Sequence, residues 1–207
     1  MFPTRKWRLF ALACIEPFRN YVSDERFATV LETLAHDAEG SCSPEAFDRA
    51  RALAWDAHDA LTDDPSEQRW YYAERHVAGA ISEAVEEDQN SRAAFVPSNC
   101  AAAAYYLAPN ARAEDIRREA ECRHLALVRE IWGNPFRPVA LDPLWLTFDV
   151  QALVRGIYDD KAFDRMPILA DALQDGGCDS ADVLNHCRGP GPHVRGCWVL
   201  DVLLEKA

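Results

Sequence analysis

The sequence predicts an all-α protein, a compact multi-helix bundle that ends in a C-terminal helical module. Two observations carry this prediction. Apolar residues recur every three or four positions along most of the chain, which is the period of an amphipathic helix, and hardly any stretch alternates apolar and polar residues as a half-buried strand does. Ser, Thr, Gly and Pro also stand where such helices are expected to begin and end.

The N-terminal part is predicted to hold six helices. Pro17 breaks the first, Ser23 is expected to cap the second, and Ser43 followed by Pro44 opens the third. Gln89 to Asn99 is interpreted as a loop. In order, the helices are expected at about 4–17, 23–40, 43–61, 66–87, 100–107 and 112–132.

After Gly133 the sequence no longer favours a helix, because residues 133–139 contain two prolines that keep the residues before them out of the helical region. This connector separates a predicted N-terminal bundle, 1–132, from a C-terminal module, 133–207, and the two are expected to form one compact unit. Thr147 and Asp179 or Ser180 are expected to begin helices. Another helix is expected around Pro167, and the last from about Gly196.

The amino-acid composition limits the classes of partner and the cellular location that can be expected. With a formal net charge of -12 and a pI of about 4.9, the chain repels phosphate backbones, so no nucleic-acid partner is expected. The longest uncharged stretch, Ala93 to Ala111, is interrupted by two prolines and is too short in apolar residues for a membrane span. The N-terminus lacks a signal-peptide layout, so a cytoplasmic location is expected, in which the seven cysteines are thiols.

The stretch with the most chemistry runs from Asn185 to Trp198. Two histidines, two cysteines, two arginines and five Gly or Pro residues lie within these fourteen positions. Proline stiffens such a backbone and glycine bends it, so the side chains are expected to hold a defined arrangement. Three interpretations of that arrangement remain open.

The first interpretation is a zinc site. Thiolate and imidazole groups are the ligands that zinc prefers, usually in a tetrahedron. The spacing is irregular, however, and two adjacent residues such as His186 and Cys187 do not easily bind one ion. The candidate ligands are Cys178, His186, Cys187, His193 and Cys197.

The second interpretation is a Cys-His hydrolase or transferase. Cys187 or Cys197 would be the nucleophile and His193 the base that activates it. A third group, Asp171 or Asp201, would orient the histidine, and nothing in the spacing fixes this geometry.

The third interpretation, which the sequence favours, is a rigid clamp for the last helix. Here the arginines pair with acidic residues of the same module, such as Asp164, Asp171 and Asp201, or with backbone carbonyls. The favoured function is accordingly a non-catalytic protein-interaction or regulatory module that needs no cofactor and binds another protein. Its expected binding residues are Arg137, Arg188, His193, Arg195 and Trp198.

Three segments, 129–139, 162–173 and 186–198, resemble a family of uncharacterised bacterial proteins that is abundant as paralogues in some large genomes. That family carries a C-terminal GNPFRPV, FDRLPILADAL and HCRGPGPHVRGCW layout, and residues 5–25 resemble its first helix. The chain departs from the family at Ile15-Glu16-Pro17, where a cysteine and basic residues are expected. The resemblance implies membership of this family and no activity.

Overall fold

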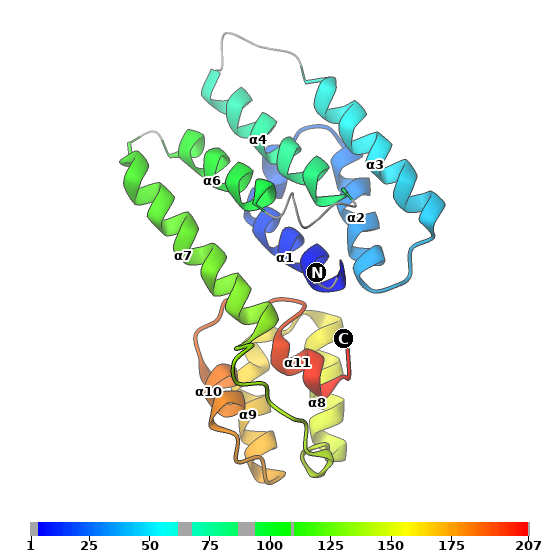
Figure 1. Ribbon diagram of the computed structural model, residues 1–207, viewed down its shortest axis with the longest axis vertical. Coiled ribbons are helices and arrows are strands. Elements are labelled where there is room, and N and C mark those ends of the chain that lie inside the picture. The colour runs from blue at the N-terminus through cyan, green and yellow to red at the C-terminus, as the bar shows by residue number, and fades with distance from the viewer. Residues whose placement is uncertain (1–3, 62–67, 87–93, 109, 207) are drawn as a thin grey trace. The chain divides into compact units, whose positions relative to one another are not determined.

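The computed structural model describes residues 4–61, 68–86, 94–108 and 110–206 (Figure 1). This part of the chain contains ten α-helices, three short 3-10 helices and no strand, which confirms the all-α prediction. None of these helices is long and apolar enough to cross a membrane. The chain divides into two compact units, Met1–Leu125 and Ala126–Ala207, and the division falls inside one long helix rather than in the connector.

The N-terminal unit is built from helices that bury one apolar stripe each. Phe27, Ile15, Leu34 and Ile81 are among its fully buried side chains. Helix α4 packs most extensively on α6, while α2 packs on α3 and on α1. The elements are α1 (Thr4–Ile15), η1 (Glu16–Tyr21), α2 (Arg26–Ala38), α3 (Pro44–Asp59), α4 (Gln68–Ala84), α6 (Phe95–Leu107) and the first part of α7 (Ala113–Trp132).

Two boundaries in this unit differ from the prediction. Helix α2 begins at Arg26 instead of Ser23, because the hydroxyl of Ser23 donates to Glu74 Oε1 at 2.7 Å and does not cap the helix. Helix α6 begins at Phe95, inside the expected loop 89–99, of which 89–93 lie outside the described residues. Pro97 is accommodated as the third residue of α6, since N–H groups of the first turn have no helical acceptor in any case.

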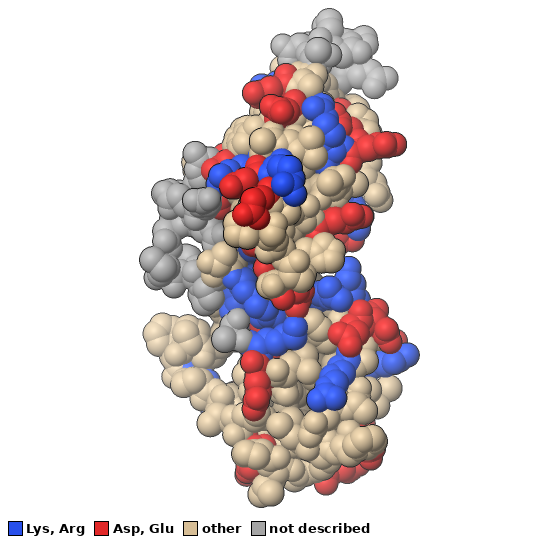
Figure 2. Space-filling model, turned by 90° about the vertical axis from the view of Figure 1, so that its right-hand side faces the viewer, with Lys and Arg blue, Asp and Glu red and all other residues tan. Residues whose placement is uncertain are grey.

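The surface carries charges of both signs. Figure 2 shows Lys and Arg side chains interspersed with Asp and Glu over the face drawn there, with uncharged areas between them. Several exposed pairs are one helical turn apart, such as Arg51 with Asp48 at 2.7 Å and Arg117 with Glu121 at 2.9 Å. Such exposed pairs each add little to stability.

The C-terminal unit surrounds a core of its own. Thr147 caps α8 and Ser180 caps α10 by accepting from backbone N–H groups of the first turn, as the sequence predicts. Helix α9 packs on α8 and on α10. Helix α11 packs on the same two helices, α8 and α10. The elements after α7 are η2 (Pro143–Trp145), α8 (Phe148–Asp160), η3 (Phe163–Arg165), α9 (Met166–Asp175), α10 (Ala181–Arg188) and α11 (Trp198–Leu203).

Helix α10 reaches further than expected. His186 and Cys187 lie in its last turn and not in the loop that follows. Adjacent helical residues face different directions, and here Cys187 enters the core with no exposed surface while His186 is half-buried on another side. The Gly-Pro loop is therefore shorter and runs from Gly189 to Cys197. His186 lies in the last turn of α10, just before this loop begins.

Candidate metal centre

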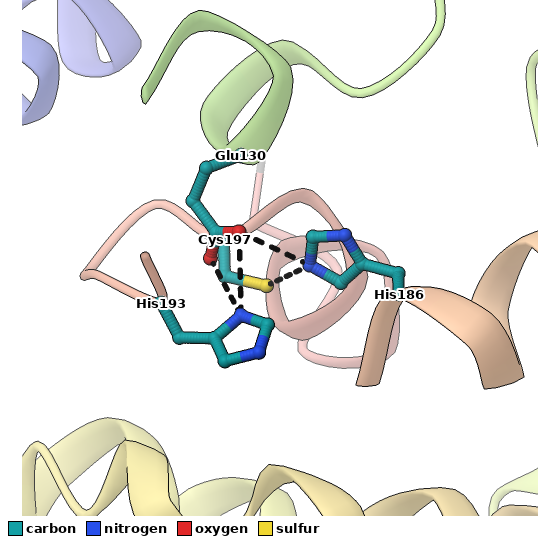
Figure 3. A group of neighbouring side chains, drawn as sticks. All are labelled: Glu130, His186, His193 and Cys197. Atoms are coloured by element: carbon teal, nitrogen blue, oxygen red, sulfur yellow. Dashed lines mark hydrogen bonds and ion pairs between the residues drawn. The ribbon is translucent and has the colours of Figure 1, made fainter. Parts of the chain in front are cut away.

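Four side chains from two helices and one loop converge in the C-terminal unit (Figure 3). They are Glu130 of α7, His186 of α10, His193 of the loop, and Cys197, which immediately precedes α11. One ligand atom from each, a carboxylate oxygen, two imidazole nitrogens and a sulfur, all lie within 4.8 Å of one another. The sequence motif thus supplies three of the four groups, and a separate helix supplies the fourth.

Glu130 is the acidic member, and it is almost fully buried at 4% exposure. It lies three residues after Leu127 and next to Ile131, both buried, so it shares the inward face of α7. Its Oε1 accepts from the backbone N–H of Val194 at 3.3 Å. A buried carboxylate is costly unless it has charged or hydrogen-bonded partners, and the two histidines supply them.

His193 is oriented by the loop that carries it. Its Nε2 lies 3.2 Å from the carbonyl oxygen of Gly189, and a carbonyl only accepts, so Nε2 carries a proton. Its Nδ1 therefore faces Glu130, 3.3 Å from both carboxylate oxygens. Burial alone would lower the pKa of His193, but the hydrogen bond to Glu130 and the charge of Glu130 raise it above its usual value.

His186 is held by Trp198. The indole N–H of Trp198 donates to Nδ1 of His186 at 3.1 Å, so the neutral ring carries its proton on Nε2. That nitrogen lies 3.1 Å from Sγ of Cys197 and 3.3 Å from Oε2 of Glu130. Burial lowers the pKa of His186, with a partly opposing effect of Glu130, which keeps the ring neutral.

Cys197 has no exposed surface, and it precedes the first turn of α11. Burial, followed by the negative charge of Glu130, raises the pKa of its thiol well above the usual value. Two glycines shape its surroundings. Gly196 has a φ of 90°, and Gly133 has a φ of 63° and lies so close to Trp198 that an added Cβ would be 3.0 Å from its Cγ. Both positions therefore require glycine for the turn, and Gly133 also leaves room for the indole.

The other cysteines proposed as ligands lie elsewhere. Cys178 and Cys187 are buried among the apolar side chains of this unit and are not members of the four-residue group. Burial raises the pKa of the Cys187 thiol to about 12, with Glu130 contributing in the same direction. Because a thiolate is the reactive form, protonated and enclosed thiols at positions 187 and 197 disfavour the interpretation of either as a nucleophile.

The arginines of the motif are used inside the unit. Arg188 donates to Asp171 Oδ1 at 2.8 Å and to Gln174 Oε1 at 2.7 Å. Arg195 donates to the carbonyl oxygens of Tyr158 and Asp159 at the end of α8, at 3.4 and 3.2 Å. Arg137, which lies in the connector and outside this motif, is 3.5 Å from Asp182. The expected pairings with Asp171 and with backbone carbonyls are both present. Arg188 joins α10 to α9, and Arg195 joins the loop to α8.

Glu130 is the member of the group that the sequence reasoning missed. On α7 the apolar Val128 is 40% exposed, whereas Glu130 takes the inward position beside Leu127 and Ile131. The available signal was a carboxylate on the apolar face of a helix, directly before the Gly133 turn. A residue that is expensive to bury, at such a position, indicates a buried partner of opposite charge.

No family model matches the chain, and no curated protein and no solved structure is significantly similar to it. The resemblance to the uncharacterised bacterial family therefore stays a prediction.

Proposed function

We propose that the C-terminal unit is a zinc-binding structural module, in which Glu130, His186, His193 and Cys197 hold one ion. The observation that carries the proposal is the convergence of these four ligand atoms within 4.8 Å inside a folded unit. Zinc is bound by this combination of carboxylate, imidazole and thiolate groups, and four protein ligands are typical of structural rather than catalytic sites.

The spacing of the ligand atoms fits such an ion. Zinc–ligand bonds of about 2.0–2.3 Å place neighbouring ligands of a tetrahedron about 3.3–3.6 Å apart. The distances from Nε2 of His186 to Sγ of Cys197 and to Oε2 of Glu130 are 3.1 and 3.3 Å, and Nδ1 of His193 lies 3.3 Å from Glu130. These three distances are close to those of a zinc tetrahedron, and no two of the four ligand atoms are more than 4.8 Å apart.

The hydrogen-bond partners of two of the ligands, His193 and Glu130, also support the proposal. Histidines that bind metals usually donate their other N–H to a carbonyl or carboxylate, which fixes the ring and leaves the facing nitrogen free to bind. His193 has this arrangement, with Nε2–H directed at Gly189. Glu130 is likewise fixed by the N–H of Val194.

The ion would tie together the end of α7, the end of α10, the loop and the start of α11. The last helix is only six residues long, Trp198–Leu203, and cannot be stable alone. A metal bound through Cys197 and His193 would fix both the loop and the entry into this helix. Its role is thus to stabilise one arrangement of the unit, which retains the clamp that the sequence favours and adds the ion at its centre.

Replacing Trp198 by Phe is expected to strengthen zinc binding. A zinc ion on Nε2 of His186 requires the proton of the ring to move to Nδ1, where the N–H of Trp198 now donates. Removing that donor takes away one competing hydrogen bond, so the affinity should rise roughly two- to tenfold, while the metal-free protein becomes less stable. Competition titration with a chromophoric chelator measures this. Trp145→Phe, a buried tryptophan of the same unit, is the control, and weaker binding by Trp198→Phe would rule out this role.

Zinc binding and the contribution of the His193–Glu130 pair to metal-free stability are expected to respond to pH in opposite directions. The raised pKa of His193 means that its pairing with Glu130 stabilises the metal-free fold at low pH, and that this contribution is lost as pH rises through the folded pKa. Zinc must displace protons from Cys197 and His193, so its affinity should rise with pH, on the order of tenfold per unit for each proton released. Thermal unfolding with zinc and with a chelator, from acid to mildly alkaline pH, should show a zinc-induced increase in Tm that grows with pH. A constant increase would contradict the ligand assignment.

Metal analysis of the purified, untagged chain tests the proposal itself. The expected result is close to one zinc per chain and a marked loss of thermal stability after treatment with a chelator. No more than a trace of zinc, together with an unchanged unfolding curve in chelator and in added zinc, would end it.

Protein binding remains a second candidate function, supported by a different observation from the one expected. Phe136 is 91% exposed at the tip of a turn in which its N–H donates to Asn134 Oδ1 at 3.0 Å. Phe148 and Leu144 are 85% and 79% exposed. Large apolar side chains displayed in this way favour contact with another protein. A photo-crosslinking residue at position 136 should give a discrete crosslinked product in cells. The same residue at position 121, an exposed site on α7, is the control. If position 136 gives no product that position 121 does not also give, this candidate function is refuted.

A further inference from the structure

A pocket in the N-terminal unit, distinct from the proposed metal centre, is bounded by η1, α6 and α7. Its volume is about 170 Å³. The apolar part of its lining consists mostly of alanines and includes Ala101, Ala104, Ala108, Ala120 and Ile116. A cavity of about 150 Å³ with an apolar lining accepts a benzene ring. The pocket is therefore large enough for one ring or one branched aliphatic side chain.

The alanine-rich sequence of α6 makes this space. Residues 101, 104 and 108 are separated by three and four positions, so they lie on one face of the helix or its end. Each contributes a single methyl group where a leucine would fill the space. Cys100, beside them in the lining, has a thiol whose pKa burial raises to about 12, so this part of the lining is uncharged at neutral pH.

Two opposite charges also line the pocket. Glu119 and Arg123 are one helical turn apart on α7, and both are exposed. On the same helix Arg117 pairs with Glu121 at 2.9 Å and Arg118 with Asp115 at 3.0 Å. Among the described residues no ion pair joins Glu119 to a partner, and Arg123 donates only to the carbonyl oxygen of Ala13, at 3.4 Å.

The third polar group of the lining is His124, and it adds no charge. Burial, followed by the nearby charge of Arg123, lowers the pKa of its imidazole. The pocket thus offers one cation, one anion and an apolar space of the size of a single side chain.

From this combination we propose that the pocket binds a free α-amino acid with a mid-sized apolar side chain, such as leucine or phenylalanine. The side chain would occupy the space among the alanines, the carboxylate would pair with Arg123, and the ammonium would pair with Glu119. A simple carboxylate or amine of the same size satisfies only one of the two charges. An amino acid inside a peptide lacks at least one of them.

Calorimetric titration of the chain tests this with five probes. L-Leucine or L-phenylalanine is expected to bind. 4-Methylpentanoate, which lacks the ammonium, and 3-methylbutylamine, which lacks the carboxylate, should bind at least about tenfold more weakly, and so should L-alanine, which lacks the apolar side chain. Failure of both leucine and phenylalanine to bind, or equal binding of leucine and its single-charge analogues, would overturn the proposal.

Substitutions locate the binding site. Ala104→Leu fills the pocket, and Glu119→Gln and Arg123→Gln each remove one charge at an exposed position, so all three should weaken leucine binding at least about tenfold. Glu121→Gln and Arg117→Gln, which change paired charges on the same helix, should leave it unchanged. Circular dichroism checks that each variant is folded. Leucine binding that survives both Ala104→Leu and Glu119→Gln would place the ligand elsewhere and refute the inference, whatever the zinc content of the chain.

Discussion

The Cys197→Ser variant is expected to bind zinc on the order of 10²–10³-fold more weakly than the natural chain. Structural zinc sites contribute about 10–16 kcal/mol in total, so one of four ligands accounts for roughly 2.5–4 kcal/mol. A serine hydroxyl is a poor substitute, because it does not ionise as the thiol does when the metal binds. Competition titration measures the affinity, and the increase in Tm on adding zinc should shrink accordingly.

Cys187→Ser provides the matched control. Cys187 and Cys197 are both cysteines without exposed surface in the same unit, and they differ in that only Cys197 belongs to the four-residue group. Both substitutions place a hydroxyl in a buried site, so the metal-free variants should lose comparable stability, about 1–3 kcal/mol. Only Cys197→Ser should lose zinc. The reverse pattern, with zinc lost in Cys187→Ser, would show that the sequence motif binds metal through another set of residues.

The Glu130→Gln variant is expected to have the largest effect on stability. Its carboxylate is 4% exposed and faces two imidazoles, and removing one partner of a buried charged pair costs about 3–5 kcal/mol. Zinc binding should weaken as well, since a neutral amide is a poorer ligand. Without Glu130 only burial acts strongly on His193, so its pKa should move from above to below its usual value.

Chemical denaturation and an NMR titration of the His193 ring measure these changes. Glu121→Gln is the control, because Glu121 is an exposed carboxylate of the same helix whose pair with Arg117 is worth at most about 1 kcal/mol. The metal-free difference between the natural chain and Glu130→Gln should be larger at pH 6 than at pH 8, since the stabilisation by protonated His193 is present only below its folded pKa. Equal denaturation of the two Gln variants would contradict the assigned role of Glu130.

Much of the fold could be predicted because it depends on local rules. The period of the apolar residues identifies the helices, and Ser43, Thr147 and Ser180 cap them as expected. The errors arose where a distant residue competed with a local preference. Ser23 binds Glu74 from α4 instead of capping α2, and α6 begins before Pro97 because proline is tolerated in a first turn.

The candidate metal centre could be predicted only in part, for the same reason. His186, His193 and Cys197 stand in one short motif, and the structure brings them together. The fourth member, Glu130, comes from a different helix, and nothing in local spacing shows which helix packs against the loop. Cys187 was an attractive candidate by its chemistry, but its position next to His186 on a helix turns it toward the core.

Cobalt(II) titration of the metal-free chain tests whether Glu130, His186, His193 and Cys197 bind one metal ion together. Cobalt(II) takes the place of zinc in tetrahedral sites, and its absorption reports the geometry and the presence of a sulfur ligand. Saturation is expected at one cobalt per chain, with strong tetrahedral visible bands and a thiolate-to-cobalt charge-transfer band. Zinc should abolish both kinds of band, and both should be lost in Cys197→Ser but not in Cys187→Ser. A weak octahedral spectrum without a charge-transfer band, or a spectrum unchanged by Cys197→Ser, would contradict a metal centre formed by Glu130, His186, His193 and Cys197.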